Sequence, residues 1–119
     1  MYSPEIVANF SDPTHNGVLE SPDRQVETKD PVCGDQVKLW LSLQDERVAS
    51  ARFQAWGCAT SVASANILCK WMEGRRIDEI AAATAEDLAA LLGAVRPEQT
   101  HCIHIMQTLI GDIVAGGTS

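Results

Sequence analysis

Five residues have side chains and positions that suit a metal or cluster site. Two of them lie in a Pro-Val-Cys-Gly-Asp loop, one follows a glycine between a predicted strand and a predicted helix, and two stand in the first turns of the last predicted helix: Cys33, Asp35, Cys58, His101 and Cys102. Sites are commonly assembled from loops and element ends that a rigid scaffold presents. Three thiolates with one imidazole or carboxylate form a soft, tetrahedral ligand set that suits zinc or an iron–sulfur cluster.

The fourth ligand of such a site is either Asp35 or His101. Asp35 follows the loop cysteine across a glycine, so a turn can bring its carboxylate to the same centre. His101 is adjacent to Cys102, and adjacent side chains diverge in a regular helix, so both serve one site only if the first turn is open. His104 lies about 200° around the helix from Cys102, and we expect it and His15 to be surface residues. A harder, weakly held fourth ligand favours a site that builds a cluster and hands it over.

Cys58 and Cys69 stand on one predicted helix and have different expected roles. Cys58 is at the helix start, where unpaired N–H groups and the macrodipole stabilise thiolate over thiol. Cys69 lies about 16 Å further along the axis at 1.5 Å per residue. Two thiolates, each about 2.3 Å from one ion, cannot be so far apart. We therefore expect Cys69 to be a packing residue.

Length and composition restrict the function classes. The 119 residues fit one domain, which we place at 1–119, and 45% hydrophobic with 21% charged residues is an ordinary globular composition. The formal charge of -7 repels phosphate backbones and anionic lipid. The sequence has no apolar run long enough to span a membrane and no export signal, so we expect a cytoplasmic protein with reduced cysteines and neither a nucleic-acid nor a membrane partner.

Hydrophobic periodicity predicts the elements that must position these residues. Alternation of apolar and polar residues predicts strands at 37–43 and 49–55, joined by a polar turn, and Pro22 confines a weaker strand within 18–28 to a sheet edge. Helices are predicted over 4–10, 58–72, 77–83, from Thr84 to the stop at Gly93, and from about Pro97 onward. Strands early and helices late predict an α+β domain with helices on one face of a small antiparallel sheet.

The last helix carries an apolar stripe spaced by threes and fours, made of Cys102, Met106, Leu109, Ile110 and Ile113. Such a stripe faces a core. The helix therefore presents its first cysteine from the core side.

Taken together, the motifs resemble the iron–sulfur cluster assembly scaffold family, of the IscU type and the similar N-terminal domain of NifU. The resemblance covers nearly the whole chain. Its motifs, in order, are Tyr2-Ser3, Pro13, Asn16-Gly17, Pro31-x-Cys33-Gly34-Asp35, Phe53-x-x-x-Gly57-Cys58, Ala63-Ser64 and His101-Cys102.

The resemblance implies a fold of three antiparallel strands with helices against them, and a scaffold function without turnover of its own. By the same resemblance, Cys33, Cys58 and Cys102 match the scaffold cysteines, Asp35 matches an aspartate that tunes cluster lability, and His101 matches the histidine before the third cysteine. The implied cargo is an iron–sulfur cluster, a two-iron cluster before a four-iron one, and Zn²⁺ suits the same ligands in the isolated protein.

The implied partners are a cysteine desulfurase, an iron donor or frataxin-like regulator, and apo iron–sulfur acceptor proteins. Sulfur would arrive as a persulfide, for which Cys102 is the first-choice acceptor. A homodimer is compatible with the sequence. The family's Leu-Pro-Pro-Val-Lys motif is absent, with Ala94-Val95-Arg96-Pro97-Glu98 in its place, which leaves recognition by the specialised chaperone pair open.

The alternative is a zinc-dependent sulfurtransferase of the SufU type, in which the same ligands hold Zn²⁺ and a thiolate accepts persulfide sulfur. That branch carries an insertion between its second and third cysteines, which this chain lacks. The sequence therefore favours the scaffold.

Overall fold

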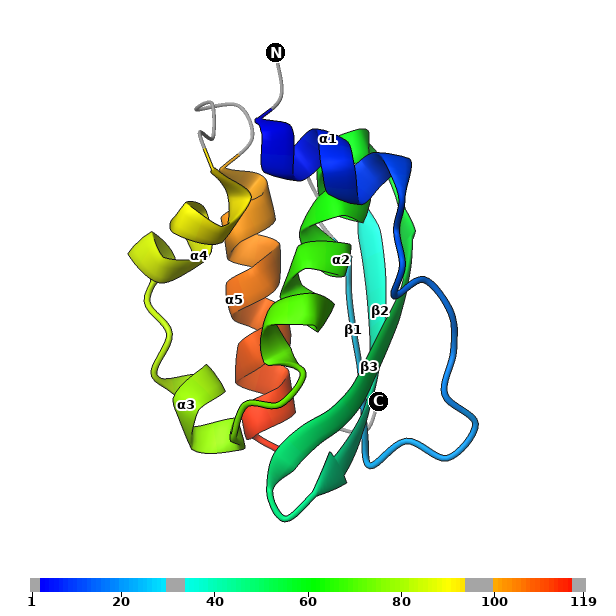
Figure 1. Ribbon diagram of the computed structural model, residues 1–119, viewed down its shortest axis with the longest axis vertical. Helices are drawn as coiled ribbons and strands as arrows, with labels where there is room; N and C mark the ends of the chain where they lie inside the picture. Colours follow the sequence, from blue (N-terminus) through cyan, green and yellow to red (C-terminus); the bar gives the residue numbers. More distant parts are fainter. Residues whose placement is uncertain (1–2, 30–33, 94–99, 117–119) are drawn as a thin grey trace.

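A computed structural model describes residues 3–29, 34–93 and 100–116 of the chain. These residues form five helices and three strands: α1 (Pro4–Ser11), β1 (Arg24–Lys29), β2 (Gln36–Gln44), β3 (Arg47–Trp56), α2 (Ala59–Met72), α3 (Ile77–Ala81), α4 (Ala85–Leu92) and α5 (His101–Val114). The strands make one antiparallel sheet in the order β1-β2-β3. The helices lie on one side of this sheet, which confirms the predicted α+β class (Figure 1).

The sheet forms where alternation predicted strands, with one difference. β2 and β3 are joined by a two-residue turn in which Asp45 and Glu46 both have positive φ, 54° and 64°, as a tight hairpin requires. The weaker strand is shorter than predicted, because regular pairing begins at Arg24, after Pro22, rather than near residue 18. β1 pairs only with β2, so it is the edge strand that the proline predicted.

Most helix starts lie where the capping residues predicted them, while α1 ends one residue later and α3 two residues earlier than predicted. The Ser3 hydroxyl accepts a hydrogen bond from the Ile6 N–H at the start of α1, and Thr84 caps α4 in a capping box with Asp87. The last helix is described from His101 onward, and its predicted start near Pro97 lies outside the described residues. Within the described part of the chain, no helix has the length and apolar character needed to cross a membrane.

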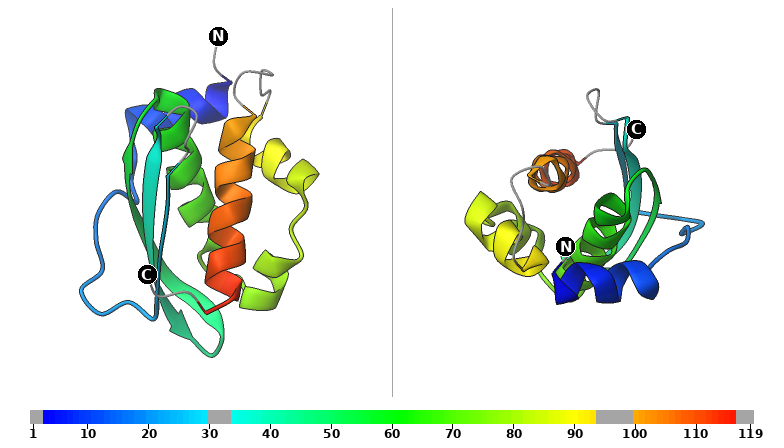
Figure 2. Two further views of the ribbon diagram at one scale, coloured as in Figure 1. Left: turned by 180° about the vertical axis from the view of Figure 1, so that it is seen from behind. Right: turned by 90° about the horizontal axis from the view of Figure 1, so that it is seen from above.

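α2 is the central helix of the fold. It packs against β3 and α1, while α5 packs against β1, α2, α3 and α4 (Figure 2). Every residue of the predicted α5 stripe is buried, and Phe53, Leu39 and Leu68 fill the space between the sheet and the helices. The three elements that carry the candidate site, β2, α2 and α5, are therefore fixed by one core.

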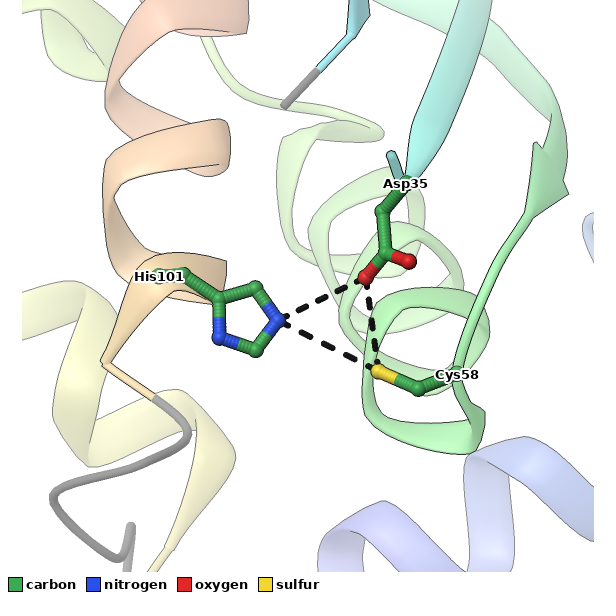
Figure 3. Close-up of side chains that lie close together, drawn as sticks. All are labelled: Asp35, Cys58 and His101. Carbon is green, nitrogen blue, oxygen red and sulfur yellow. Dashed lines mark hydrogen bonds and ion pairs between the residues drawn. The ribbon is translucent and has the colours of Figure 1, made fainter. Parts of the chain in front are cut away.

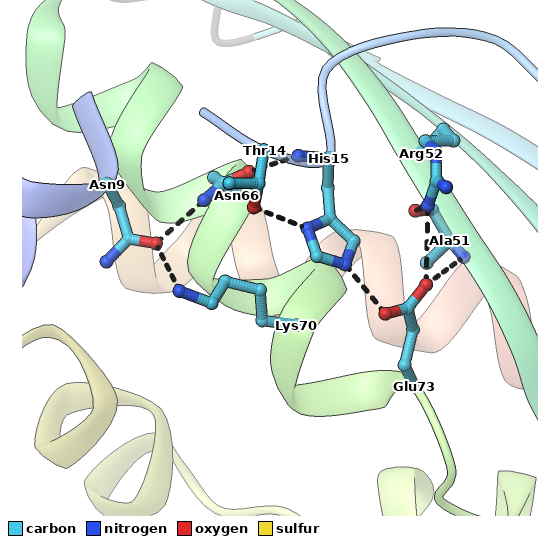
Figure 4. A network of polar contacts seen from close by, with 8 residues as sticks. All are labelled: Asn9, Thr14, His15, Ala51, Arg52, Asn66, Lys70 and Glu73. Carbon is cyan, nitrogen blue, oxygen red and sulfur yellow. Dashed lines mark hydrogen bonds and ion pairs between the residues drawn. The ribbon is translucent and has the colours of Figure 1, made fainter. Parts of the chain in front are cut away.

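A polar network ties the loop after α1 to the end of α2 and to β3 (Figure 4). His15 donates its backbone N–H to Asn66 Oδ1 at 2.8 Å, and its Nε2 lies 2.6 Å from Glu73 Oε1. The other Glu73 oxygen accepts from the Ala51 N–H at 3.0 Å and from Arg52 Nη1 at 3.3 Å. The prediction that His15 is a plain surface residue is wrong, because its ring is mostly covered and pairs with a carboxylate.

The same network continues along α2 to α1. Buried Asn66 donates from Nδ2 to Asn9 Oδ1 at 2.7 Å, and Lys70 Nζ lies 3.4 Å from the same oxygen. Asn9 in turn donates to the Glu5 carbonyl at 2.7 Å. α1 and the segment after it are thus held to α2 by side-chain hydrogen bonds as well as by apolar packing.

Glu73 makes the stability of the fold depend on pH. Partial burial raises the pKa of Glu73, but hydrogen bonds from His15 and Ala51 and the nearby positive charges outweigh it and hold the pKa below 4.5. As pH falls, the Glu73 carboxylate takes up a proton in the unfolded chain before it does so in the folded chain. Its contribution to the folding free energy is therefore complete above the unfolded pKa and is lost as pH falls through the folded pKa. We expect the urea midpoint to fall on going from pH 7 to pH 4, and Glu73→Gln to cost roughly 1–2 kcal/mol at pH 7.

The control for this prediction is Glu20→Gln, which removes an exposed carboxylate from the loop between α1 and β1. The difference in unfolding free energy between Glu73→Gln and wild type should shrink at pH 4, and the difference for Glu20→Gln should stay near zero. A Glu73→Gln effect that is equally large at both pH values would contradict the assignment.

Candidate metal centre

Three candidate ligands from distant parts of the sequence meet at one end of the sheet (Figure 3). Asp35 Oδ2 lies 3.4 Å from Cys58 Sγ and 3.4 Å from His101 Nε2. Cys58 Sγ and His101 Nε2 are 4.0 Å apart. One donor atom from each residue lies within 4.8 Å of the other two, so a single ion could contact all three.

The sheet register explains why the first two ligands meet. Gln36 at the start of β2 pairs with Trp56 at the end of β3. Asp35 and Cys58, just beyond these strand ends, are therefore neighbours although the hairpin separates them in sequence. Cys58 is also the N-cap of α2, with extended backbone and no side-chain capping bond, so its thiol is left for the site.

Gly57 makes room for Asp35 at this corner. A Cβ on Gly57 would come within 2.2 Å of Asp35 Oδ1, and the φ of Gly57 is +145°, which side chains rarely permit. Asp35 itself is only 4% exposed. The glycine before Cys58 thus allows a carboxylate to lie against the backbone of the site.

Replacing this glycine should damage the site as well as the fold. We expect Gly57→Ala to displace the Asp35 carboxylate, to cost roughly 1–3 kcal/mol of unfolding free energy, and to weaken binding of Co²⁺ used as a metal probe. Gly74→Ala is the matched control, because Gly74 also has positive φ, +87°, but a Cβ there meets nothing within 4 Å. Gly74→Ala should lose stability and keep Co²⁺ affinity; equal Co²⁺ affinity in both variants would contradict the role of Gly57.

Cys102 lies beside this triangle, on the core side. Its Sγ is 3.6 Å from His101 Nε2, and the residue is 1% exposed. Burial raises the pKa of the Cys102 thiol to about 11, hydrogen bonds with Ser64 and Ser61 oppose the rise, and nearby Cys58 adds to it. In this conformation Cys58 is the exposed thiol of the pair.

His101 and Cys102, although adjacent in sequence, lie differently relative to the site. His101 is the first residue of α5, and its ring reaches across the helix end toward Asp35 and Cys58 (Figure 3). Cys102 points to the core as part of the apolar stripe, yet its sulfur remains close to the ring nitrogen. The donor atoms that lie within 4.8 Å of one another belong to Asp35, Cys58 and His101, so in this conformation Cys102 borders the group without being part of it.

The remaining sequence candidates fall into three groups. Cys33 lies outside the described residues. Cys69 is fully buried in the core, and burial raises the pKa of its thiol, which confirms it as a packing residue. His104 is exposed on α5, as expected.

Sequence reasoning missed the buried hydroxyl of Ser61, which donates to Asp35 Oδ2 and lies 3.5 Å from Cys58 Sγ. Its spacing of three residues after the helix-start cysteine was the available signal, because such residues face the same side of a helix.

The donor set combines a soft sulfur, an imidazole nitrogen and a hard carboxylate oxygen, with a second sulfur close by. Zinc and iron both accept such mixed sets, and the oxygen is the ligand most readily exchanged on a soft site. The described residues therefore fit a tetrahedral metal ion or the iron of a small cluster.

The chain matches a known protein family over most of its length. The family model described as the NifU-like N terminal domain matches residues 1–115. The chain is 29% identical over 118 residues to the iron-sulfur cluster assembly scaffold protein IscU of Escherichia coli K12, covering 96% of this chain and 91% of that protein. It is also 29% identical over 105 residues to IscU 1 of Archaeoglobus fulgidus, covering 88% of this chain and 69% of that protein.

Solved structures share the fold. A candidate iron-sulfur cluster assembly scaffold protein for the SUF system from Fervidobacterium islandicum AW-1 superposes with a TM-score of 0.77 at 22% identity, covering 92% of this chain and 93% of that one. The N-terminal part of a nitrogen-fixing NifU-like protein from Brucella abortus gives 0.65 at 18% identity, covering 96% and 81%. These likenesses establish the three-stranded α+β fold.

Proposed function

The chain belongs to the NifU-like N-terminal domain family, and from this premise we propose that it is a scaffold on which an iron–sulfur cluster is assembled and then passed to apo-acceptor proteins. The observation that carries the proposal is the meeting of Asp35, Cys58 and His101 within 4.8 Å, with the Cys102 sulfur beside them. The names of the IscU relatives support the same role. The protein would hold the cluster as cargo and have no turnover of its own.

In this proposal the cluster is bound by thiolates from Cys33, Cys58 and Cys102, with Asp35 and His101 competing for the remaining position. Both non-sulfur groups lie close to the Cys58 sulfur, which supports alternation between them. We propose a two-iron cluster, because a single compact ligand group suits a small cluster.

We further propose that sulfur comes from a cysteine desulfurase as persulfide and that iron comes from a separate donor or a frataxin-like regulator. A persulfide sulfur needs two electrons to become sulfide, so assembly also requires a reductant. Cys102 as first acceptor stays a prediction, and its burial means that the start of α5 must open before sulfur reaches it. A reducing cytoplasm remains the expected compartment, since the ligands act as free thiolates.

Anaerobic reconstitution tests the proposal. The chain is incubated with a cysteine desulfurase, cysteine, ferrous iron and a thiol reductant, and the visible charge-transfer absorption is followed. We expect this absorption to appear and then to move to an apo-ferredoxin added as acceptor. No cluster, together with tightly held zinc and stimulation of the desulfurase, would instead assign the zinc-dependent sulfurtransferase function.

A further inference from the structure

Ser61 is a buried hydroxyl that the proposed function leaves without a role. It is 2% exposed, lies on the first turn of α2, and makes polar contacts with two of the candidate ligands. Its Oγ donates to Asp35 Oδ2 and lies 3.5 Å from Cys58 Sγ, and the Cys102 thiol is nearby.

The Ser61 hydroxyl bonds to another element rather than to its own helix. A serine hydroxyl inside a helix commonly bonds the carbonyl four residues earlier, as Ser64 does when it donates to the Thr60 carbonyl at 2.6 Å. Ser61 instead reaches from α2 to the residue before β2. A hydroxyl has one proton, so in this conformation Asp35 takes the proton that Ser61 could otherwise donate to a nearby thiolate.

The bond orients a carboxylate that has little freedom otherwise. Asp35 is nearly inaccessible, with Gly57 behind Oδ1 and Ser61 beside Oδ2. The oxygen that Ser61 holds is the same one that faces Cys58 and His101. Hydrogen bonds to a ligand's own oxygen or nitrogen fix its orientation and tune its strength toward a metal.

We propose that Ser61 is a positioning residue that acts through Asp35: its hydroxyl holds Asp35 Oδ2 toward the metal centre and so sets how strongly this carboxylate binds the incoming metal. The inference rests on the proposed function, because it assumes that a metal ion reaches the site formed by Asp35, Cys58 and His101. A structural hydroxyl that only fills space, or one that acts through Cys102, would behave differently in the following test.

The test is a double-mutant cycle read out with Co²⁺, whose absorption reports its sulfur and oxygen ligands. Wild type, Ser61→Ala, Asp35→Ala and the double variant are titrated under anaerobic conditions after urea unfolding shows that each is folded. We expect Ser61→Ala to weaken Co²⁺ binding roughly 10-fold or more and to shift the ligand-field bands. In the Asp35→Ala background the same substitution should change neither quantity, because its partner is gone.

Two further variants distinguish a role of Ser61 through Asp35 from a role in packing or through Cys102. Ser64→Ala removes a buried hydroxyl that contacts Cys102 but has no bond to Asp35, so it should lose distinctly less affinity. Ser61→Thr keeps the hydroxyl and should restore the wild-type bands. Equal losses from Ser61→Ala and Ser64→Ala, or equal losses in the presence and absence of Asp35, would overturn the inference.

Failure of the inference and failure of the proposed function give different results. If wild type binds neither Co²⁺ nor a cluster, the function itself is wrong. If wild type binds both and Ser61→Ala matches it in affinity and spectrum, only the role of Ser61 is wrong.

Discussion

Cys58→Ser is expected to abolish cluster assembly while the protein stays folded. Cys58 is the exposed thiol of the centre and the only candidate sulfur among the described residues within hydrogen-bonding distance of Asp35. A serine hydroxyl stays protonated at neutral pH and is a poor ligand for iron. Since loss of an outer partner alone costs roughly 10–100-fold in metal affinity, loss of this ligand should cost at least as much. The measurement is visible absorption after anaerobic reconstitution.

Cys69→Ala provides the matched control for this prediction. Cys69 lies on the same helix but is fully buried in the core, so its loss should lower stability without affecting assembly. Cys33→Ser and Cys102→Ser are expected to behave like Cys58→Ser. If all three serine variants formed normal clusters, the proposed ligand residues would be wrong, even though the chain belongs to the family.

The sequence predicted most of the fold because its local signals agree with its packing. Alternation predicted the inward residues Val37, Leu39 and Leu41 of β2 and Ala51 and Phe53 of β3, but Trp40 is also buried, and the alternation breaks at Ala49, near the register shift at Ser42 and Leu43. The caps Ser3 and Thr84 defined helix starts. The segment before β1 was predicted less well. Around Asn16 the backbone pairs with β3 at Phe53, a contact between distant residues that no local pattern encodes.

The candidate site was predictable as a set of residues but not as a geometry. Residue types and element ends selected Asp35, Cys58, His101 and Cys102, because thiols at such junctions are chemically distinctive. That Cys102 is buried while Cys58 is exposed depends on how α5 packs against the sheet and α2. Ser61 was missed because a serine within an apolar helix is ordinary until its partner on another element is known.

The pairing of His15 with Glu73 was missed for a related reason. A histidine in a Pro-Thr-His-Asn-Gly turn has the sequence features of a solvated loop residue. Only the fold brings it beside α2, where its ring pairs with Glu73 and its backbone N–H donates to Asn66. Polar networks between distant segments are thus the part of this structure that composition and periodicity predict least.

Asp35→Ala is expected to lengthen the lifetime of the assembled cluster. In the proposed centre Asp35 is the one hard oxygen ligand and therefore the most exchangeable, and its Oδ2 also lies close to Ser61, Cys58 and His101. Without it, His101 is the nearest replacement and binds more firmly to iron. The measurement is the rate at which visible absorption decays, both alone and in the presence of an apo-acceptor.

Asp112→Ala controls for the loss of one negative charge, because Asp112 is an exposed residue on α5, and its cluster lifetime should equal that of wild type. Asp35→Asn separates shape from charge: it keeps an oxygen that can accept from Ser61 but ligates iron weakly, so it should also prolong the lifetime. If Asp35→Ala and Asp35→Asn fail to assemble a cluster at all, the carboxylate is needed for binding rather than release. His101 would then be the exchangeable ligand, and the slower decay expected for Asp35→Ala would be found with His101→Ala instead.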